Sequence, residues 1–247
     1  MSTGNSDPAR WKNVPVEVGG IQLASPLRVY EIKQLSPSER RIITSVQAIS
    51  KSAERGDVEL YVYDELMCES LLGRQGWRGN LTPLAAFRKQ VFLEIPSPLN
   101  RSKFNQTANW VKGDEVDRFI DFLLDVDENK LVEVMRQRSG FTDFELMNAT
   151  KLQEFKTLCS DKLFGKNKRR DAYHFWSAEC SGIDYFLTVD MKFVNTYKNA
   201  LKHNQMNMGC IVITPEELTK MLDISEVEIH IPESGKMFQL NGLEYRN

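Results

Sequence analysis

The first third of the chain combines two hydrophobic periods. Residues 14–23 form two alternating stretches around a Gly-Gly pair, which predicts a short hairpin. Residues 27–32 are a further strand candidate. A capping box with proline at the first helical position, Ser36-Pro37-Ser38-Glu39, then opens a stretch of apolar residues at helical spacing. This pattern predicts a helix that runs to about Glu54.

A second strand and helix follow in the same order. Residues 58–63 alternate as a strand does, and Asp64 can cap a short helix that ends at Gly73. The order strand, helix, strand, helix over residues 24–72 predicts that the two strands pair in parallel through right-handed crossovers.

Residues 73–165 have a mainly helical pattern. Apolar residues form one stripe of a long amphipathic helix over 114–137, and Thr142-Asp143-Phe144-Glu145 is a capping box for a second helix that reaches Leu158. Residues 91–95 are a short strand or a sheet edge, because prolines follow. We expect this block to be a helical insertion that serves as a lid or as a surface for a partner.

The stretch from 166 to 222 combines clear elements with candidate chemistry. A helix is predicted to begin near Asp171 and to end at Gly182, because an acidic residue suits the positive end of the helix dipole and glycine suits a helix C-terminus. Residues 185–189 suit a strand covered on both faces in a parallel sheet. Asp190 follows at the carboxyl end of that strand, where ligands bind in open α/β sheets.

The last part of the chain again has the pattern of strands. Residues 227–231 and 236–240 are strand candidates around a Pro-Glu-Ser-Gly turn, and Asn241-Gly242 is a strong hairpin signal. We expect residues 223–247 to form a ribbon beside the hairpin of residues 1–23, so that the termini build a small antiparallel appendage.

The later part of the chain resembles a PIN domain, a compact α/β fold whose members are mostly metal-dependent ribonucleases. The resemblance rests on Asp-Ala-x-His at 171–174, on Gly-x-Asp-Tyr-Phe-Leu-Thr-x-Asp at 182–190, and on the strand and helix of 211–218, in this order and spacing. It covers residues 168–222 well and the first half loosely. It implies an α/β, three-layer fold in one enlarged domain, with a central, mostly parallel sheet flanked by helices.

Composition limits the classes of function. A chain of 247 residues with 41% hydrophobic residues can bury a sizeable core. Its net charge of −2 gives no general attraction to nucleic acid, so any such binding depends on a local basic patch.

The cysteines and the N-terminus indicate where the protein works. The four cysteines are far apart, without a C-x-x-C pair, so we expect buried free thiols in a reducing compartment and neither a zinc site nor a disulfide framework. They are Cys68, Cys159, Cys180 and Cys210. The N-terminus lacks the apolar core of a signal peptide, and no run is long enough to span a bilayer. A cytoplasmic protein without a membrane partner is expected.

The PIN resemblance implies a Mg²⁺ or Mn²⁺ site built from carboxylates. These ions prefer hard oxygen ligands and keep positions open for a phosphate oxygen and an attacking water. The expected metal ligands and catalytic residues are Glu31, Glu69, Asp171 and Asp190. Asp64 and Glu65 are close to Glu69 in the sequence, so the choice among these three stays open.

The first strand departs from the family pattern. The family has an Asp-Thr-Asn-like triplet there, whereas this chain has Glu31-Ile32-Lys33. Glutamate can still bind a metal, but its extra methylene moves the carboxylate, and a misplacement of about 1 Å can lower a rate about a hundredfold. The Lys33 ammonium either takes the place of the cation among the carboxylates or holds a phosphate.

Other residues near the expected site have a functional and a structural interpretation. His174 orients a neighbour or packs, and Thr188 forms a hydrogen bond near the site or suits a strand. Asp171 and Asp190 also suit helix N-caps. The densest positive cluster contains Lys162, Lys166, Lys168, Arg169 and Arg170. It is either a solvated surface or a patch that binds RNA phosphates. Cations at a helix N-terminus are unfavourable because they oppose the helix dipole, and this favours a role in phosphate binding.

Two classes of function follow. In the first, the chain is a PIN-type endoribonuclease that cleaves phosphodiester bonds in single-stranded or structured RNA, with water as the nucleophile and the residues from Lys166 to Arg170 steering the substrate. In the second, it is a catalytically degraded module that binds RNA or a protein partner. Lys33 then takes the place of the metal, and the helical block of 73–165 is the interface for a partner or inhibitor. The oligomeric state, including a homodimer, stays open.

Overall fold

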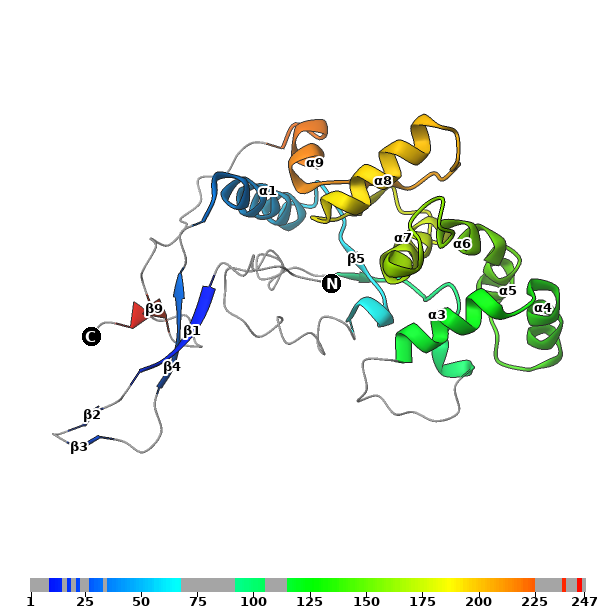
Figure 1. Cartoon of the computed structure of the whole chain (residues 1–247), viewed down its shortest axis with the longest axis horizontal. Helices are drawn as coiled ribbons and strands as arrows, with labels where there is room; N and C mark the ends of the chain where they lie inside the picture. Colours follow the sequence, from blue (N-terminus) through cyan, green and yellow to red (C-terminus); the bar gives the residue numbers. More distant parts are fainter. Residues whose placement is uncertain are drawn as a thin grey trace. The chain divides into compact units, whose positions relative to one another are not determined.

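The structure is a computed structural model of the chain (Figure 1). It describes the backbone of residues 9–14, 17–18, 21–22, 27–32, 35–67, 92–104, 115–224, 237–238 and 244–245. Side chains are described at 35–67, 92–104 and 116–224. The chain divides into two compact units. The first contains Met1–Leu60, Ser70–Val91 and Pro215–Asn247, and the second contains Tyr61–Glu69 and Phe92–Thr214.

An antiparallel sheet in the first unit is formed by both ends of the chain, with the strand order β1, β4, β9, β10. These strands are Ala9–Val14, Leu27–Ile32, Met237–Phe238 and Glu244–Tyr245. β2 (Glu17–Val18) and β3 (Ile21–Gln22) form the predicted hairpin. The described strands of the C-terminal ribbon join the same sheet as β1 of the N-terminal stretch, where β9 pairs with β4, and among the described residues they do not pair with the hairpin. The predicted strand 227–231 lies outside the described residues.

The predicted parallel pairing of residues 27–32 is wrong. β4 pairs antiparallel with β1 on one side and antiparallel with β9 on the other. The prediction rested on the order of elements after residue 24 and gave no strand to residues 9–14. A partner so close in sequence closes a short loop at little entropic cost, whereas a parallel partner needs a long crossover.

α1 spans Pro37–Glu54 and begins as predicted. The Ser36 hydroxyl accepts the N–H of Glu39 at 3.3 Å, and the Glu39 carboxylate accepts the N–H of Ser36 at 2.7 Å. Gly56 follows the helix with a φ of +82°, a conformation that favours glycine. α9 (Pro215–Met221) packs against α1 in the same unit.

Two helices of the second unit replace the single one predicted over 114–137. α3 spans Glu115–Asp125 and α4 spans Glu128–Gln137. The break occurs because Asp127 is extended and caps α4, where its carboxylate accepts the N–H of Lys130 at 2.9 Å.

The capping box predicted at Thr142 is present at the start of α5 (Asp143–Ala149). The Thr142 hydroxyl accepts the N–H of Glu145 at 3.2 Å, and the Glu145 carboxylate accepts the N–H of Thr142 at 2.8 Å. The apolar residues predicted to continue this helix lie instead in a separate helix, α6 (Leu152–Leu158). Over the described residues 115–165 the chain is therefore mainly helical.

The next elements alternate between helix and parallel strand. α7 (Arg169–Cys180) is followed by Gly182, whose φ is +67°, and then by β7 (Tyr185–Leu187). α8 (Met191–Lys202) leads to β8 (Ile211–Ile213), which pairs with β7 in parallel. This order matches the prediction, except that β7 is half-buried and not covered on both faces.

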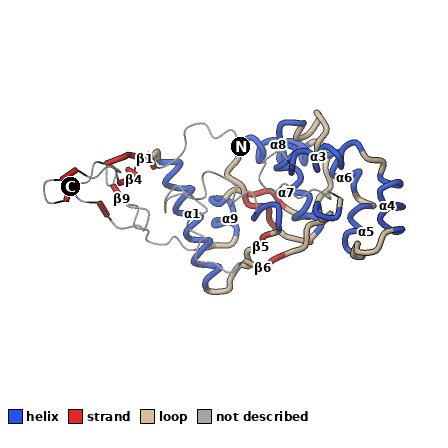
Figure 2. The backbone as a smooth tube through the Cα atoms, turned by 90° about the horizontal axis from the view of Figure 1, so that it is seen from below, coloured by secondary structure: helices blue, strands red, loops and turns tan. Residues whose placement is uncertain are grey.

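α7 is the central helix of the second unit and packs against α3 and α6 (Figures 1 and 2). Tyr173 packs edge-to-face against Phe119 of α3 and Phe155 of α6. On another side of the helix, Phe175 packs edge-to-face against Phe193 of α8. A helix that is apolar on most sides is a helix buried in a core, which explains the aromatic run in α7.

A second parallel pair joins β5 (Tyr61–Val62) to β6 (Leu93–Glu94). These strands lie within the predicted stretches 58–63 and 91–95. Residues 64–67 are helical, and the predicted continuation of that helix lies outside the described residues. The chain therefore has a mixed fold of helices and sheets with small parallel pairs.

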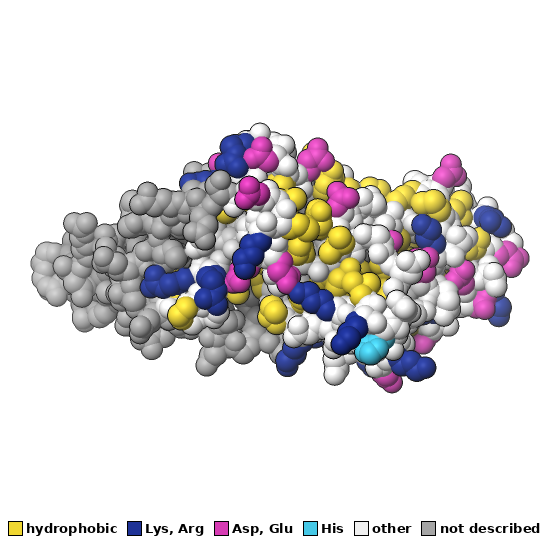
Figure 3. All heavy atoms as spheres, turned by 90° about the horizontal axis from the view of Figure 1, so that it is seen from above, with side chains coloured by type: hydrophobic (Ala, Val, Ile, Leu, Met, Phe, Trp, Pro, Cys, Tyr) yellow, Lys and Arg dark blue, Asp and Glu magenta, His cyan; other side chains and the backbone are white. Residues whose placement is uncertain are grey.

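The surface in Figure 3 carries interspersed positive and negative side chains over its described part. This mixture agrees with the net charge of −2. Among the described helices, none is both long and apolar enough to cross a bilayer.

Glu179 ties the end of α7 to the residues before β8. Its two carboxylate oxygens accept the N–H of Gly209 at 3.0 Å and the N–H of Cys210 at 2.6 Å. A glutamine here turns one acceptor into a donor, so we expect Glu179→Gln to lower the free energy of unfolding by about 1–3 kcal/mol. Urea denaturation measures this, with Glu154→Gln on the exposed side of α6 as a control that changes it by less than about 0.5 kcal/mol. A loss no larger than that of the control would contradict the role of Glu179.

Candidate functional site

Two of the four predicted metal ligands meet in the second unit. Asp171 lies in the first turn of α7, and Asp190 lies between β7 and α8. The Lys168 ammonium is 3.8 Å from Oδ2 of Asp171 and donates a hydrogen bond to Oδ2 of Asp190. A helix start and a strand end thus bring two carboxylates to one cation.

Asp190 also caps the helix that follows it. Its Oδ1 accepts the N–H of Lys192 at 2.9 Å and the N–H of Phe193 at 3.2 Å. The structural interpretation of Asp190 as an N-cap therefore holds, and it leaves Oδ2 directed at Lys168. The cap fixes the carboxylate in place by binding one of its two oxygens.

The pKa values of the two carboxyl groups move in opposite directions. Burial raises the pKa of Asp171, against the opposing effect of the Lys168 ammonium. Burial also acts to raise the pKa of Asp190, but hydrogen bonds from Lys168 and from two backbone N–H groups outweigh it and lower that pKa below its ordinary value. Asp190 is thus the more firmly ionised member, and Asp171 accepts a proton more readily. Such a divergence is common where two carboxyl groups have different tasks.

Thr188 and His174 lie near this pair in the sequence, and each makes a hydrogen bond. The Thr188 hydroxyl accepts the N–H of Asp190 at 3.1 Å, so it helps to orient the strand end. His174 is buried on α7, and its Nδ1 shares a hydrogen bond with the Tyr63 hydroxyl. The rings of His174 and Tyr63 also pack edge-to-face, with centroids 5.7 Å apart. Tyr63 was missed from the sequence, although it directly precedes the acidic residues Asp64 and Glu65.

Of the three acidic residues left open, the structure describes two. Asp64 is exposed, whereas Glu65 is buried and accepts a hydrogen bond from the Ser97 hydroxyl at 2.5 Å. Burial raises the pKa of Glu65, and the Ser97 hydrogen bond only partly opposes this effect. Ser97 was missed because it lies between two prolines that were interpreted only as strand breakers. Glu69 lies outside the described residues.

The predicted basic cluster is largely neutralised by acidic residues of α3. Arg170 binds Asp117 with two nitrogens, at 2.7 and 3.2 Å, and Arg169 lies 2.8 Å from Asp121. Lys168 is paired with Asp171 and Asp190 as described above. Lys162 and Lys166 are exposed, and the described residues offer neither of them an ion-pair partner. These two lysines therefore remain as cations directed at solvent.

The other predicted site residues are not brought to this pair by the described part of the chain. Glu31 lies in β4 of the first unit, where it is in register with Arg10 and Met237, and its side chain is outside the described residues. Lys33 is also outside them. Because β4 belongs to an antiparallel sheet, the reason for expecting Glu31 at the carboxyl end of a parallel strand no longer applies.

The described cysteines are free thiols of low reactivity. Burial raises the pKa of each thiol to about 12. They are Cys159, Cys180 and Cys210. Because the thiolate is the nucleophile and the metal ligand, these groups suit packing better than catalysis.

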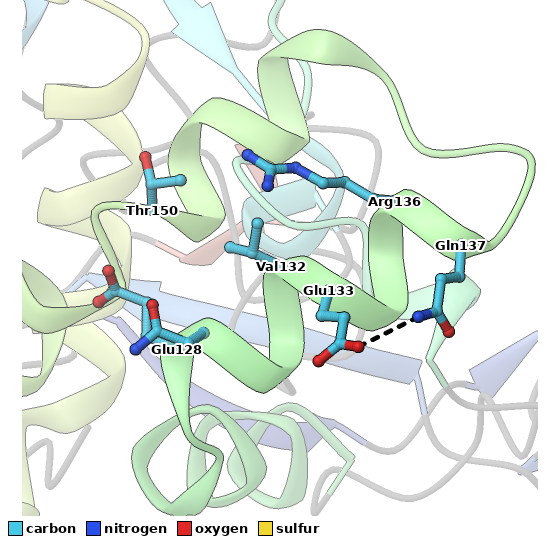
Figure 4. Close-up of a pocket in the computed structure, with 7 residues that line it drawn as sticks. Glu128, Val132, Glu133, Arg136, Gln137 and Thr150 are labelled. Carbon is cyan, nitrogen blue, oxygen red and sulfur yellow. Dashed lines mark hydrogen bonds between the residues drawn. The ribbon is translucent and has the colours of Figure 1, made fainter.

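A hollow of about 570 Å³ lies along α4 beside the end of α5 (Figure 4). Its charged side chains are already engaged in part, since Glu128 accepts the N–H of Gln153 at 3.0 Å and Glu133 accepts a hydrogen bond from the Gln137 amide at 3.2 Å. Val132, Arg136 and Thr150 also line it, as Figure 4 shows. The hollow lies on the helical block that was predicted as a partner surface.

The donor chemistry of the Asp171 and Asp190 pair suits a hard divalent cation, because two carboxylates already surround one positive charge. Across 35–67, 92–104 and 116–224, no group of three or more His, Cys, Asp or Glu side chains is arranged to hold a metal ion. The pair is therefore part of a ligand set, which further carboxylates would have to complete.

Comparison of the chain with protein-family models, with curated proteins and with solved structures found no match. Any assignment of function therefore depends on the chemistry of the site.

Proposed function

We propose that this chain is a PIN-like, metal-dependent endoribonuclease in which Asp171 and Asp190 hold Mg²⁺ or Mn²⁺. The observation that carries the proposal is the convergence of these two carboxylates on one cation, the Lys168 ammonium. Glu65 and Glu69, which belong to the same unit as the pair, are the candidates for completing the ligand set. When bound, the ion would supply positive charge to a phosphate oxygen and lower the pKa of a water molecule that attacks phosphorus.

The protein side chains would contribute position and charge. The N–H groups of α8 and the hydroxyl of Thr188 hold the Asp190 segment in one geometry. Burial raises the pKa of Asp171 in the absence of a metal ion, and a bound dication would favour its ionised form. Lys166 is exposed three residues before α7, so its ammonium would attract a phosphate.

A PIN-like three-layer arrangement is also part of the proposal. Its support is the parallel pair β7 and β8, the succession of α7, β7, α8 and β8, and the second parallel pair β5 and β6. The antiparallel β4 argues for a first strand other than residues 27–32.

The test is cleavage of labelled single-stranded RNA with Mn²⁺ by the wild type and by Asp190→Asn. We expect the wild type to cleave RNA and Asp190→Asn to lose that activity, since the amide removes a charged ligand. Asp184→Asn is the matched control, because Asp184 is exposed at the other end of β7, and it should cleave as the wild type does. Equal cleavage by all three proteins would contradict the proposal and indicate another site or a contaminant.

A second candidate function is favoured by the same lysine. With Lys168 between Asp171 and Asp190, the pair is neutralised without a metal, as in a degraded site that binds RNA or a protein partner. Retained RNA binding by the wild type without any cleavage in Mg²⁺ or Mn²⁺ would favour this module. The hollow on α4 would then be a candidate surface for its partner.

A further inference from the structure

Two features of the fold hold the backbone segment that carries Lys168. Lys168 ends the short 3-10 helix Lys166–Lys168, and its N–H donates to the carbonyl of Gly165 at 3.2 Å. Gly165 has a φ of +66°, a conformation that favours glycine, and its N–H donates to the carbonyl of Ser160 at 3.0 Å. The backbone of Lys168 is thus held by a tight turn.

An aromatic stack joins that turn to the helix capped by Asp190. Phe164 is buried and stacks on Phe193 of α8, with ring centroids 4.1 Å apart and planes at 8°. The N–H of Phe193 is one of the two groups that hold the Asp190 carboxylate. The stack therefore fixes the segment that carries Lys168 next to the segment that carries Asp190.

The side chains of the lysine and the two carboxylates are only partly exposed to solvent. The side chains of Lys168, Asp171 and Asp190 are 29%, 29% and 33% exposed. Two nearby carboxylates repel each other unless a cation lies between them. The repulsion is stronger for a partly buried pair than for a fully solvated one. The ammonium supplies that cation in the absence of a metal ion.

We propose that Lys168 is a built-in competitor of the divalent cation for Asp171 and Asp190. This inference rests on the proposed function and adds a means of regulating the same site. An ammonium that contacts these oxygens repels an incoming dication, so metal binding requires the Lys168 side chain to leave Asp190. If the ammonium occupies Asp190 in about nine molecules of ten, the apparent metal affinity is about tenfold weaker than that of the open pair.

A titration of Mn²⁺ followed by electron paramagnetic resonance measures this affinity without RNA or catalysis. We expect Lys168→Met to bind Mn²⁺ about tenfold more tightly than the wild type, a difference of about 1.4 kcal/mol. Lys168→Gln should change in the same direction. Lys192→Met is the control, because Lys192 is exposed two residues from Asp190 and has no ion-pair partner in the described part of the chain, and it should change the affinity less than about threefold.

Thermal unfolding of the same variants separates competition from a purely structural ion pair. In a chelator, Lys168→Met should melt below the wild type, because its two carboxylates lack a counter-ion. In saturating Mn²⁺ it should gain more in melting temperature than the wild type gains, since a tighter ligand stabilises the folded state more. A lower melting temperature with no extra gain from Mn²⁺ would overturn the inference.

The failure of this inference and the failure of the proposed function have different signatures. If the wild type binds Mn²⁺, Asp190→Asn does not, and Lys168→Met binds no more tightly than the wild type, the competition is disproved and the metal site stands. If neither the wild type nor Lys168→Met shows Mn²⁺ binding that depends on Asp190, the proposed metal site is disproved and the inference with it.

Discussion

Replacing Glu145 by alanine is expected to lower the free energy of unfolding by about 2–4 kcal/mol, because it leaves a half-buried ammonium and several backbone N–H groups without their charged acceptor. The Glu145 side chain is only 3% exposed. It accepts hydrogen bonds from the Lys103 ammonium at 2.5 Å and from the N–H of Asn100 at 3.2 Å, in addition to its part in the capping box with Thr142. Alanine leaves all of these donors without their acceptor.

The same carboxylate gives the effect a pH dependence. Burial acts to raise the pKa of Glu145, but the hydrogen bonds from Lys103 and Thr142 outweigh burial and bring the pKa below its ordinary value of 4.5. A lowered folded pKa means that the ionised group stabilises the protein above about pH 4.5, and that this stabilisation is lost as the pH falls through the folded pKa. The difference between the wild type and Glu145→Ala should therefore narrow below about pH 4.5.

Urea denaturation at pH 7 and in steps down to pH 3 measures both parts of this prediction. Glu133→Ala is the matched control, because Glu133 is an exposed glutamate on α4 whose side chain accepts a hydrogen bond from Gln137, and its loss should stay within about 0.5 kcal/mol. If Glu145→Ala unfolds like this control at pH 7, the buried network does not stabilise the helical block as we describe it.

Elements marked by short local motifs were predictable from the sequence. Both capping boxes, at Ser36 and at Thr142, are present where their spacing placed them. Gly182 ends α7, and the strand that precedes Asp190 pairs in parallel with the strand at 211–213. Each of these features depends on residues that are neighbours in sequence, or on the chain order of strand and helix.

The split between α3 and α4 shows how one local signal can be hidden by another. Apolar residues continue at helical spacing from Leu123 and Leu124 to Leu131 and Val132, so the pattern favoured one long helix. Asp127 lies between these pairs and adopts the extended conformation of an N-cap. An aspartate on the polar face fits a helix and a cap equally well by periodicity, and only the tertiary structure decides between them.

Partners that are distant in sequence could not be predicted. The basic cluster was interpreted either as a solvated surface or as a patch for RNA, whereas Arg169 and Arg170 form ion pairs with Asp117 and Asp121 on α3. Which carboxylate a cation meets depends on how α3 and α7 pack, and the charge pattern of either helix alone does not contain that information. The partner of β4 was mispredicted for the same reason.

The rate losses caused by replacing Asp171 and by replacing Asp190 are expected to be non-additive. If both carboxylates hold one ion, Asp171→Asn and Asp190→Asn should each slow RNA cleavage by about a hundredfold or more. Replacing a residue that only orients a metal ligand already lowers metal affinity or activity by about 10–100-fold. Groups that act as a unit are strongly non-additive, so the double variant should be about as slow as the slower single variant. Independent roles would instead multiply the two losses.

The most direct test of a shared metal ion is therefore the single-turnover rate of RNA cleavage in Mn²⁺ by the wild type, the two single variants and the double variant. We expect both single variants to be slow, and the rate of the double variant to lie within about threefold of theirs. A double variant slower by about ten thousandfold, or a single variant as fast as the wild type, would contradict the claim that Asp171 and Asp190 hold one metal ion.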